Sequence, residues 1–139
     1  MRASTTHLYL LRRTPFFTGL STEQLRYVIG HSREWEAQAA TVVAGSADEA
    51  DDVWILLDGG WQVQYEGRSY PSGHASPGKW YSPRRLDGDC VLLTTEHSYV
   101  MKIARADFDA MIEEGFAFHK HLDAGIAYYR SIRAGTAAQ

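Results

Sequence analysis

Residues 52–67, with the sequence DVWILLDGGWQVQYEG, constrain the fold of this chain more than any other stretch. Val53–Leu57 is a continuous apolar run that is too short for a core helix, and residues 61–65 alternate between apolar or aromatic and polar types. These patterns are typical of one strand buried on both faces and of a second strand with one face in water. Between them, Gly59–Gly60 can take the positive φ angles of a tight turn. The stretch therefore predicts a β-hairpin.

The rest of the chain predicts further short strands in the middle and helices at both ends. Further strands are expected within residues 33–44, 67–70, 90–94 and 99–103. Their close spacing is typical of a sandwich or barrel over about residues 33–103. Ser21 and Gln24 form the capping-box pattern of a helix over about residues 21–30, and helical periodicity predicts two more helices over about 105–133. Without an internal repeat or linker, residues 1–139 are expected to form one domain.

Composition and charge exclude several classes of protein. With 45% hydrophobic and 22% charged residues, the chain has an ordinary globular composition. Its net charge of −3 does not indicate binding to nucleic acid, which is itself negatively charged. No apolar run approaches the roughly 20 residues of a membrane span. The single cysteine, Cys90, cannot form an internal disulfide, which favours a reducing compartment. We therefore expect a cytoplasmic protein that binds neither nucleic acid nor membrane.

Three segments resemble, in the same order, sequence motifs of the cyclic nucleotide-binding domain family. These segments are LRRTPFFTGLSTEQL at residues 11–25, the acidic loop and strand at 45–59, and YVMKIARADFDAMI at 99–112. The order of the three segments is more specific than any one of them, and the resemblance covers about residues 8–114. It implies a mainly β fold, an antiparallel double-stranded β-helix (jelly roll), with an N-terminal helix and two C-terminal helices.

The family's phosphate-binding cassette falls on residues 77–91, which we call the cassette segment. The resemblance implies that a backbone turn and a helix N-terminus meet the phosphate, an arginine pairs with it, and a glutamate accepts a hydrogen bond from the ribose. Pro77–Tyr81 matches the opening of the cassette, but its Gly-Glu pair falls on Ser82-Pro83 and its arginine falls near Gly88-Asp89. An aspartate there disfavours an anion. The sequence therefore predicts that cyclic AMP and cyclic GMP are not bound with the family's usual affinity.

The cassette segment nevertheless offers the candidate ligand site. Arg84 and Arg85 could supply a cation from another direction, or they could be two solvated loop arginines. Trp80 and Tyr81 could stack a flat ligand or fill the interior of the β structure. Cys90 is expected to be an inert core thiol rather than a nucleophile. The candidate ligand-binding residues are Gly78, Trp80, Tyr81, Ser82, Arg84, Arg85, Asp89 and Cys90.

Other patterns do not amount to a catalytic or metal site. The four acids of residues 45–52 lack the ligand spacing of an EF-hand loop, which predicts a solvated loop. The six histidines are scattered. His74 and His97 could converge in a jelly roll, as ligands do in cupin metal sites, but a third ligand is not identifiable. No catalytic residue, metal or cofactor is expected.

These observations favour a non-enzymatic regulatory or sensor module whose ligand is a cyclic nucleotide or another small anion. The alternatives are a protein-interaction module that has lost its pocket, and a small cupin-like metal enzyme. In transcription factors of the family a helix-turn-helix follows the last helix, and no such segment is evident here. The apolar stripe over Phe118–Ile132 is long for a helix with little to cover, which predicts a homodimer through this helix.

Overall fold

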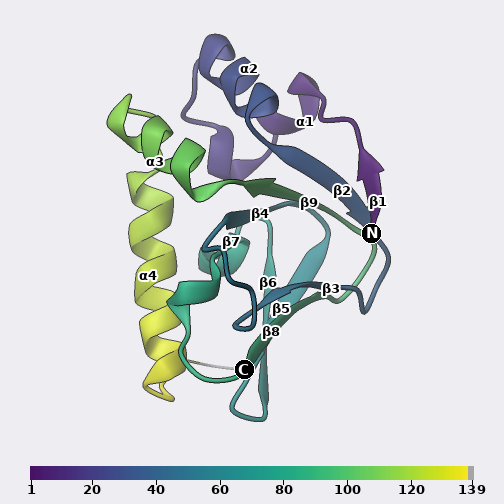
Figure 1. Ribbon diagram of the computed structural model, residues 1–139, viewed down its shortest axis with the longest axis vertical. Helices are drawn as coiled ribbons and strands as arrows, with labels where there is room; N and C mark the ends of the chain where they lie inside the picture. The colour runs from purple at the N-terminus through teal and green to yellow at the C-terminus, as the bar shows by residue number, and fades with distance from the viewer. Residues whose placement is uncertain (138–139) are drawn as a thin grey trace.

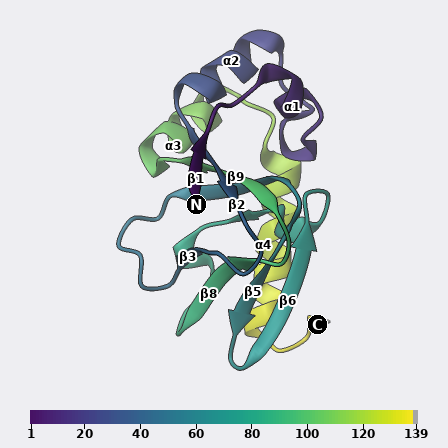
Figure 2. The same cartoon turned by 90° about the vertical axis from the view of Figure 1, so that its right-hand side faces the viewer.

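The computed structural model describes residues 1–137, which form two antiparallel β-sheets with helices at one end and along one side (Figures 1 and 2). The α-helices are α1 (Leu8–Arg12), α2 (Thr22–Gly30), α3 (Arg105–Glu113) and α4 (His119–Arg133). The 3-10 turns are η1 (Pro15–Phe17), η2 (Pro77–Lys79) and η3 (Pro83–Arg85). The strands are β1 (Arg2–Ser4), β2 (Arg33–Ala37), β3 (Val42–Gly45), β4 (Val53–Asp58), β5 (Gly60–Tyr65), β6 (Arg68–Gly73), β7 (Trp80–Tyr81), β8 (Cys90–Thr94) and β9 (Ser98–Ile103). The mainly β fold with flanking helices is confirmed.

The two sheets have the strand orders β1-β2-β9-β4-β7 and β3-β8-β5-β6, so each sheet takes strands from both halves of the chain. Side chains from both sheets form one buried cluster between them, which we call the roll interior. It consists of Val43, Ala44, Trp54, Leu56, Trp61, Val63, Tyr65, Tyr70, Tyr81, Leu86, Cys90, Leu92 and Val100, together with Tyr129 and Ile132 from α4. This arrangement is the jelly roll that the sequence predicted.

The predicted hairpin over residues 52–67 is wrong, because β4 and β5 belong to different sheets. Gly59, with φ of +95°, turns the chain from one sheet to the other at a corner packed against Ser98. The Ser98 hydroxyl accepts from the amide of Gly60 and donates to its carbonyl. The hairpin lies one strand later, where β5 pairs with β6 and Glu66–Gly67, both with positive φ, form the two-residue turn. The predicted burial of the two strands is confirmed.

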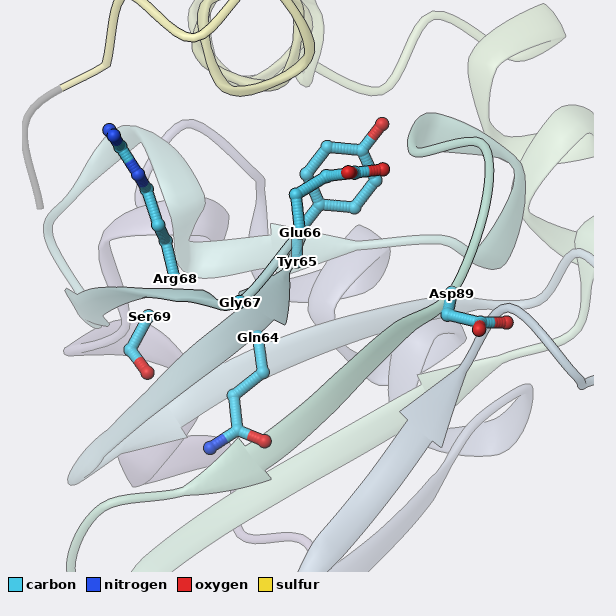
Figure 3. Close-up of a pocket in the computed structure, with 7 residues that line it drawn as sticks. All are labelled: Gln64, Tyr65, Glu66, Gly67, Arg68, Ser69 and Asp89. Carbon is cyan, nitrogen blue, oxygen red and sulfur yellow. The ribbon is translucent and has the colours of Figure 1, made fainter.

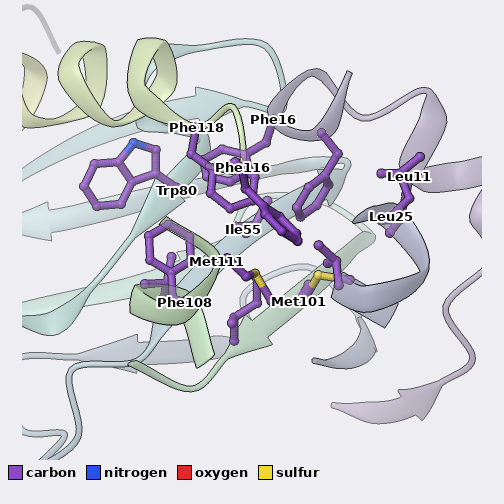
Figure 4. Close-up of a cluster of buried hydrophobic side chains, with 14 of the residues drawn as sticks. Leu11, Phe16, Leu25, Ile55, Trp80, Met101, Phe108, Met111, Phe116 and Phe118 are labelled. Carbon is purple, nitrogen blue, oxygen red and sulfur yellow. The ribbon is translucent and has the colours of Figure 1, made fainter. Parts of the chain in front are cut away.

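β4 is buried on both faces because it separates two cores. Trp54 and Leu56 point into the roll interior. Val53 and Ile55 belong to a second buried cluster that lies under the helices, which we call the helical cluster. Figure 4 shows this helical cluster, in which Phe16 and Phe118 meet with ring centroids 4.8 Å apart. A continuous apolar sequence is required of a strand in this position.

The N-terminal helix α2 forms for a local reason. The Ser21 hydroxyl accepts from the amide of Gln24 at 3.2 Å, and the Gln24 side chain accepts from the amide of Ser21 at 3.0 Å. This reciprocal pair is the predicted capping box, and it satisfies two amides that have no partner within the helix. Among the helices of residues 1–137, none has both the length and the apolar character needed to cross a membrane.

The acidic loop before β4 is not the freely solvated loop that the sequence predicted. The Asp51 carboxylate accepts from the amide of Arg84 at 3.0 Å and pairs with the guanidinium of Arg105 at 3.2 Å. Asp52 accepts from the amide of Arg105 at 3.2 Å. The prediction fails for these two aspartates because their partners lie more than thirty residues later in the chain. The loop therefore ties the cassette segment to the start of α3.

Candidate functional site

The cassette segment runs between β6 and β8 and contains only short elements. η2 and η3 are single 3-10 turns of three residues each, on either side of the two-residue strand β7. Trp80 and Tyr81 of β7 pair with Ile55 and Trp54 of β4, and their side chains consequently point to opposite faces of the sheet. Neither turn is long enough to present the aligned amides of a helix N-terminus to a phosphate.

Trp80 faces the helices and is fixed there by α4. Its indole Nε1–H donates to the carbonyl of His121 at 2.8 Å, and its own carbonyl accepts from the hydroxyl of Tyr129 at 2.6 Å. Its ring lies directly against Gly125, where a Cβ atom would come within 2.2 Å of the indole nitrogen. Trp80 is 3% exposed, so this ring packs as a core residue.

Tyr81 faces the roll interior and is fully buried. Its hydroxyl lies 2.9 Å from the Cys90 sulfur, and its ring meets the Tyr129 ring edge-on with centroids 6.0 Å apart. Burial, with the Cys90 contact, raises the pKa of Tyr81 above its ordinary value of 10.0, and burial raises the pKa of Tyr129 as well. The two phenols therefore remain protonated at neutral pH. Of the two readings of Trp80 and Tyr81, the geometry favours core packing.

Gly78 lies where three side chains converge. Its carbonyl accepts from the indole of Trp61 at 2.8 Å. A Cβ atom at this position would come within 2.2 Å of the Ser72 hydroxyl and 2.7 Å of the Tyr128 ring. The glycine is therefore required for close packing between β6, η2 and α4, at a position with an ordinary negative φ.

Lys79 is charged but only 5% exposed. Its ammonium contacts only the Ser76 carbonyl, at 3.4 Å, among the side-chain hydrogen bonds of the described residues. Burial, with repulsion from Lys120, lowers the pKa of Lys79 below its ordinary value of 10.5. Between the lowered pKa and 10.5 the unfolded chain binds more protons than the folded chain, so this residue makes stability rise with pH. At pH values below the lowered pKa, Lys79 is charged in the folded chain, and the full cost of burying this charge reduces the stability.

Replacing Lys79 with methionine is therefore expected to stabilise the chain at neutral pH, by on the order of 1 kcal/mol. The gain should shrink as the pH approaches 10.5, because the buried lysine of the wild type loses its charge. Urea denaturation of both proteins across this range measures the difference. Lys120→Met, which removes an exposed charge, serves as the control and should change stability less. A destabilised Lys79→Met variant at every pH would contradict the assignment.

The two arginines of η3 have different surroundings. The guanidinium of Arg84 donates to the carbonyls of Asp48 and Glu49, at 3.3 and 2.7 Å, so it fastens the acidic loop. Arg85 is half-buried, and within residues 1–137 its guanidinium has no recorded ion pair or hydrogen bond. Asp89 is exposed at the end of the segment and lines only surface hollows.

Ser82 and Arg85 line a cavity of about 210 Å³ between α3, α4 and the cassette segment, which we call the hinge groove. Ser82 is 1% exposed, and its hydroxyl has no hydrogen-bond partner among the described residues. The hinge groove lies on the helical side of β7, away from the roll interior. The structure thus divides the predicted site: Tyr81 and Cys90 belong to the roll interior, Ser82 and Arg85 to the hinge groove, and Arg84 and Asp89 to the surface.

A wider hollow of about 580 Å³ lies at the turn of the β5–β6 hairpin (Figure 3). The side chains of Gln64 and Arg68 point in opposite directions from the turn, and Asp89 lies apart from both. Polar groups that recognise a ligand have to converge on one point. This hollow is therefore a surface feature without a converging set of donors or acceptors.

Histidines and acids do not assemble into a metal centre in the described part of the chain. Within residues 1–137, no group of three or more His, Cys, Asp or Glu side chains lies close enough to hold a metal ion. His74 lies 3.6 Å from Asp58, and His97 lies 2.6 Å from Glu36. His74 and His97 thus have different carboxylate partners and do not form a shared metal site with them.

Comparison with known proteins finds no matching protein-family model and no matching curated protein. Solved structures do match. The sensor domain of the transcriptional regulator DNR from Pseudomonas aeruginosa has a TM-score of 0.63 and 14% identity, covering 91% of this chain and 96% of that one. A protein from Geobacter metallireducens GS-15, named for cyclic nucleotide binding, has a TM-score of 0.63 and 22% identity. The match covers 93% of this chain and 98% of that protein. The regulatory subunit of a cAMP-independent protein kinase A from Trypanosoma cruzi, bound to guanosine, has a TM-score of 0.64 and 13% identity. The match covers 93% of this chain and 50% of that subunit.

The chain has the cyclic nucleotide-binding fold. The predicted resemblance is therefore confirmed at the level of the fold. On the side of the cassette segment that faces the roll interior, which we call its inner side, the ring of Tyr81 packs against the ring of Tyr129.

The sequence prediction missed two residues of this arrangement, Gly125 and Tyr129. A glycine in the middle of an amphipathic helix costs about 1 kcal/mol relative to alanine, so its presence signals close packing. That signal was available in α4 for Gly125. Tyr129 carries no comparable signal, because an aromatic residue in an apolar helical stripe is ordinary.

Proposed function

We propose that this chain is a non-enzymatic regulatory or sensor module that does not bind cyclic AMP or cyclic GMP with ordinary affinity. The observation that carries the proposal is that Tyr81 and Tyr129 fill the space on the inner side of the cassette segment. A nucleotide held there would have to displace Tyr81 and Tyr129, which are 0% and 1% exposed and bonded to their neighbours. Removing two such aromatic side chains from a packed core costs several kcal/mol.

The charges of the segment support the same conclusion. A cyclic phosphate is best held by an arginine that donates two parallel hydrogen bonds. Arg84 already donates to two backbone carbonyls, and Arg85 lies in the hinge groove on the opposite side of β7. Asp89 brings a negative charge near the position where the family has its arginine. A cyclic phosphate at the inner side would therefore lack its cation.

Isothermal titration of the chain with cyclic AMP and cyclic GMP tests the proposal. We expect no saturable heat up to about 1 mM nucleotide, which corresponds to a binding free energy weaker than about −4 kcal/mol. Saturable binding in the micromolar range by either nucleotide would overturn the proposal. Thermal denaturation with the same nucleotides provides an independent readout, because a ligand of the folded state raises the melting temperature.

A protein-interaction module is the second candidate function, and the filled roll interior favours it as well. The two candidates differ in their response to small molecules. A sensor is stabilised by a small ligand, whereas an interaction module is stabilised only by its protein partner. A thermal-shift screen of small anions therefore separates them: stabilisation by any of them supports the sensor.

Oligomeric state and location are separate proposals. Phe118, Tyr129 and Ile132, from the stripe that predicted a homodimer, are at most 2% exposed within their own chain. Leu122 and Ile126 of the same stripe are only partly buried, so they are the stripe residues through which a homodimer could form, and light scattering of the purified chain measures whether one forms. A cytoplasmic location is supported by Cys90, a buried free thiol and the only cysteine of the sequence.

A further inference from the structure

The hinge groove combines an apolar body with a polar end. Its apolar wall is made by side chains from the four elements β4, β7, α3 and α4, and its residues are Val53, Trp80, Phe108, Ile112, Leu122 and Ile126. Its volume of about 210 Å³ is below the roughly 300–1,000 Å³ of drug-sized pockets, which restricts it to a small ligand. The wall extends the buried helical cluster shown in Figure 4, so an apolar group placed there would contact a fixed surface.

The polar end holds one cation and one hydroxyl whose hydrogen-bonding capacity is free. Arg105 is already committed: its guanidinium pairs with Asp51 at 3.2 Å and with Asp109 at 3.5 Å. Arg85 has no recorded ion pair within residues 1–137, and the Ser82 hydroxyl is buried without a partner there. A buried hydroxyl without a partner costs about 1–3 kcal/mol, which a ligand acceptor would recover.

We propose that the hinge groove binds a small carboxylate with a short apolar body. One carboxylate oxygen would accept from Ser82 and the group would pair with Arg85, while the apolar body would lie along Trp80 and Ile126. A monoanion fits better than a phosphate dianion, because Asp51 and Asp109 line the same end and repel additional negative charge. This inference rests on the proposed sensor function, for which it names the class of ligand.

Hexanoate is a suitable probe, with hexanamide as the uncharged counterpart and inorganic phosphate as the anion without an apolar body. We expect saturable binding of hexanoate to the full chain by isothermal titration, with a rise in melting temperature, and weaker or undetectable binding of the other two. Arg85→Met should weaken hexanoate binding by about tenfold or more, as expected for the loss of a charged hydrogen bond. Ile126→Phe should also weaken binding, because the larger ring fills part of the groove.

Arg68→Met is the matched control, since it removes an exposed arginine that does not line the groove and should leave hexanoate affinity unchanged. Three results would overturn the inference: no saturable hexanoate binding below about 1 mM, equal effects of the two arginine variants, or phosphate binding as tight as hexanoate. None of these three results changes the outcome expected from the titration with cyclic AMP and cyclic GMP. Failure of the ligand assignment is therefore distinguishable from failure of the proposed function.

Discussion

Replacing Gly125 with alanine is expected to destabilise the folded chain by about 3 kcal/mol. The new methyl group would lie 2.2 Å from the indole nitrogen of Trp80 and 2.4 Å from the adjacent ring carbon. Trp80 cannot move aside cheaply, because it is 3% exposed and its indole is bonded to the carbonyl of His121. The better helix propensity of alanine, worth about 1 kcal/mol, offsets only part of this cost. Urea denaturation of the variant measures the net change.

Gly30→Ala is the control for this prediction. Gly30 is also helical, at the end of α2, and a Cβ atom there would meet nothing within 4 Å. We expect this variant to be as stable as the wild type, or more stable by up to about 1 kcal/mol. Equal losses for the two glycine variants would show that helix α4 does not pack closely on Trp80.

Replacing Tyr129 with alanine is expected to cost about 3–5 kcal/mol, the usual range for removing a large aromatic side chain from a core. Tyr129 is 1% exposed, contacts the rings of Trp80 and Tyr81, and donates to the carbonyl of Trp80 at 2.6 Å. Tyr129→Phe keeps the ring and removes only the hydroxyl, so it should cost about 1–3 kcal/mol by leaving that carbonyl unsatisfied. Chemical denaturation of both variants separates ring packing from the hydrogen bond.

Tyr128→Ala provides the comparison, because Tyr128 is the neighbouring residue of α4 and is only half-buried. Its removal should cost clearly less than the removal of Tyr129. If the two alanine variants were equally stable, the result would contradict the assignment of Tyr129 to the roll interior.

Local patterns predicted the elements well, because their causes are local. The capping box of Ser21 and Gln24 is complete within four residues, and its geometry appears as predicted. The apolar run of β4 correctly indicated burial on both faces. The strand β1 was missed, because its sequence Arg-Ala-Ser is polar and its pairing depends on Glu34 and Glu36, thirty residues away.

The pairing of strands could not be predicted in the same way. Gly59–Gly60 between two strands is equally compatible with a hairpin turn and with a corner between sheets. The choice depends on β8 and β9, which pair with β5 and β4, and the paired residues lie 25 to 50 positions apart in the chain. A pattern within residues 52–67 does not contain that information.

The candidate site was predictable in composition but not in arrangement. The departures at Ser82-Pro83 and near Gly88-Asp89 are visible in the sequence alone. Whether Tyr81 stacks a ligand or fills the interior depends on where α4 lies. The difference between Arg84, held by two carbonyls, and Arg85, in the hinge groove, likewise exists only in three dimensions.

The most direct test of the filled cassette segment is a titration of ¹⁵N-labelled chain with cyclic AMP, followed through the tryptophan indole N–H signals. The indoles of Trp61 and Trp80 donate to the carbonyls of Gly78 and His121, and thus report on both sides of the segment. We predict that both signals stay in place up to about 1 mM nucleotide. A saturable shift of either signal would contradict the proposal that the chain's own aromatic residues fill the place of a nucleotide.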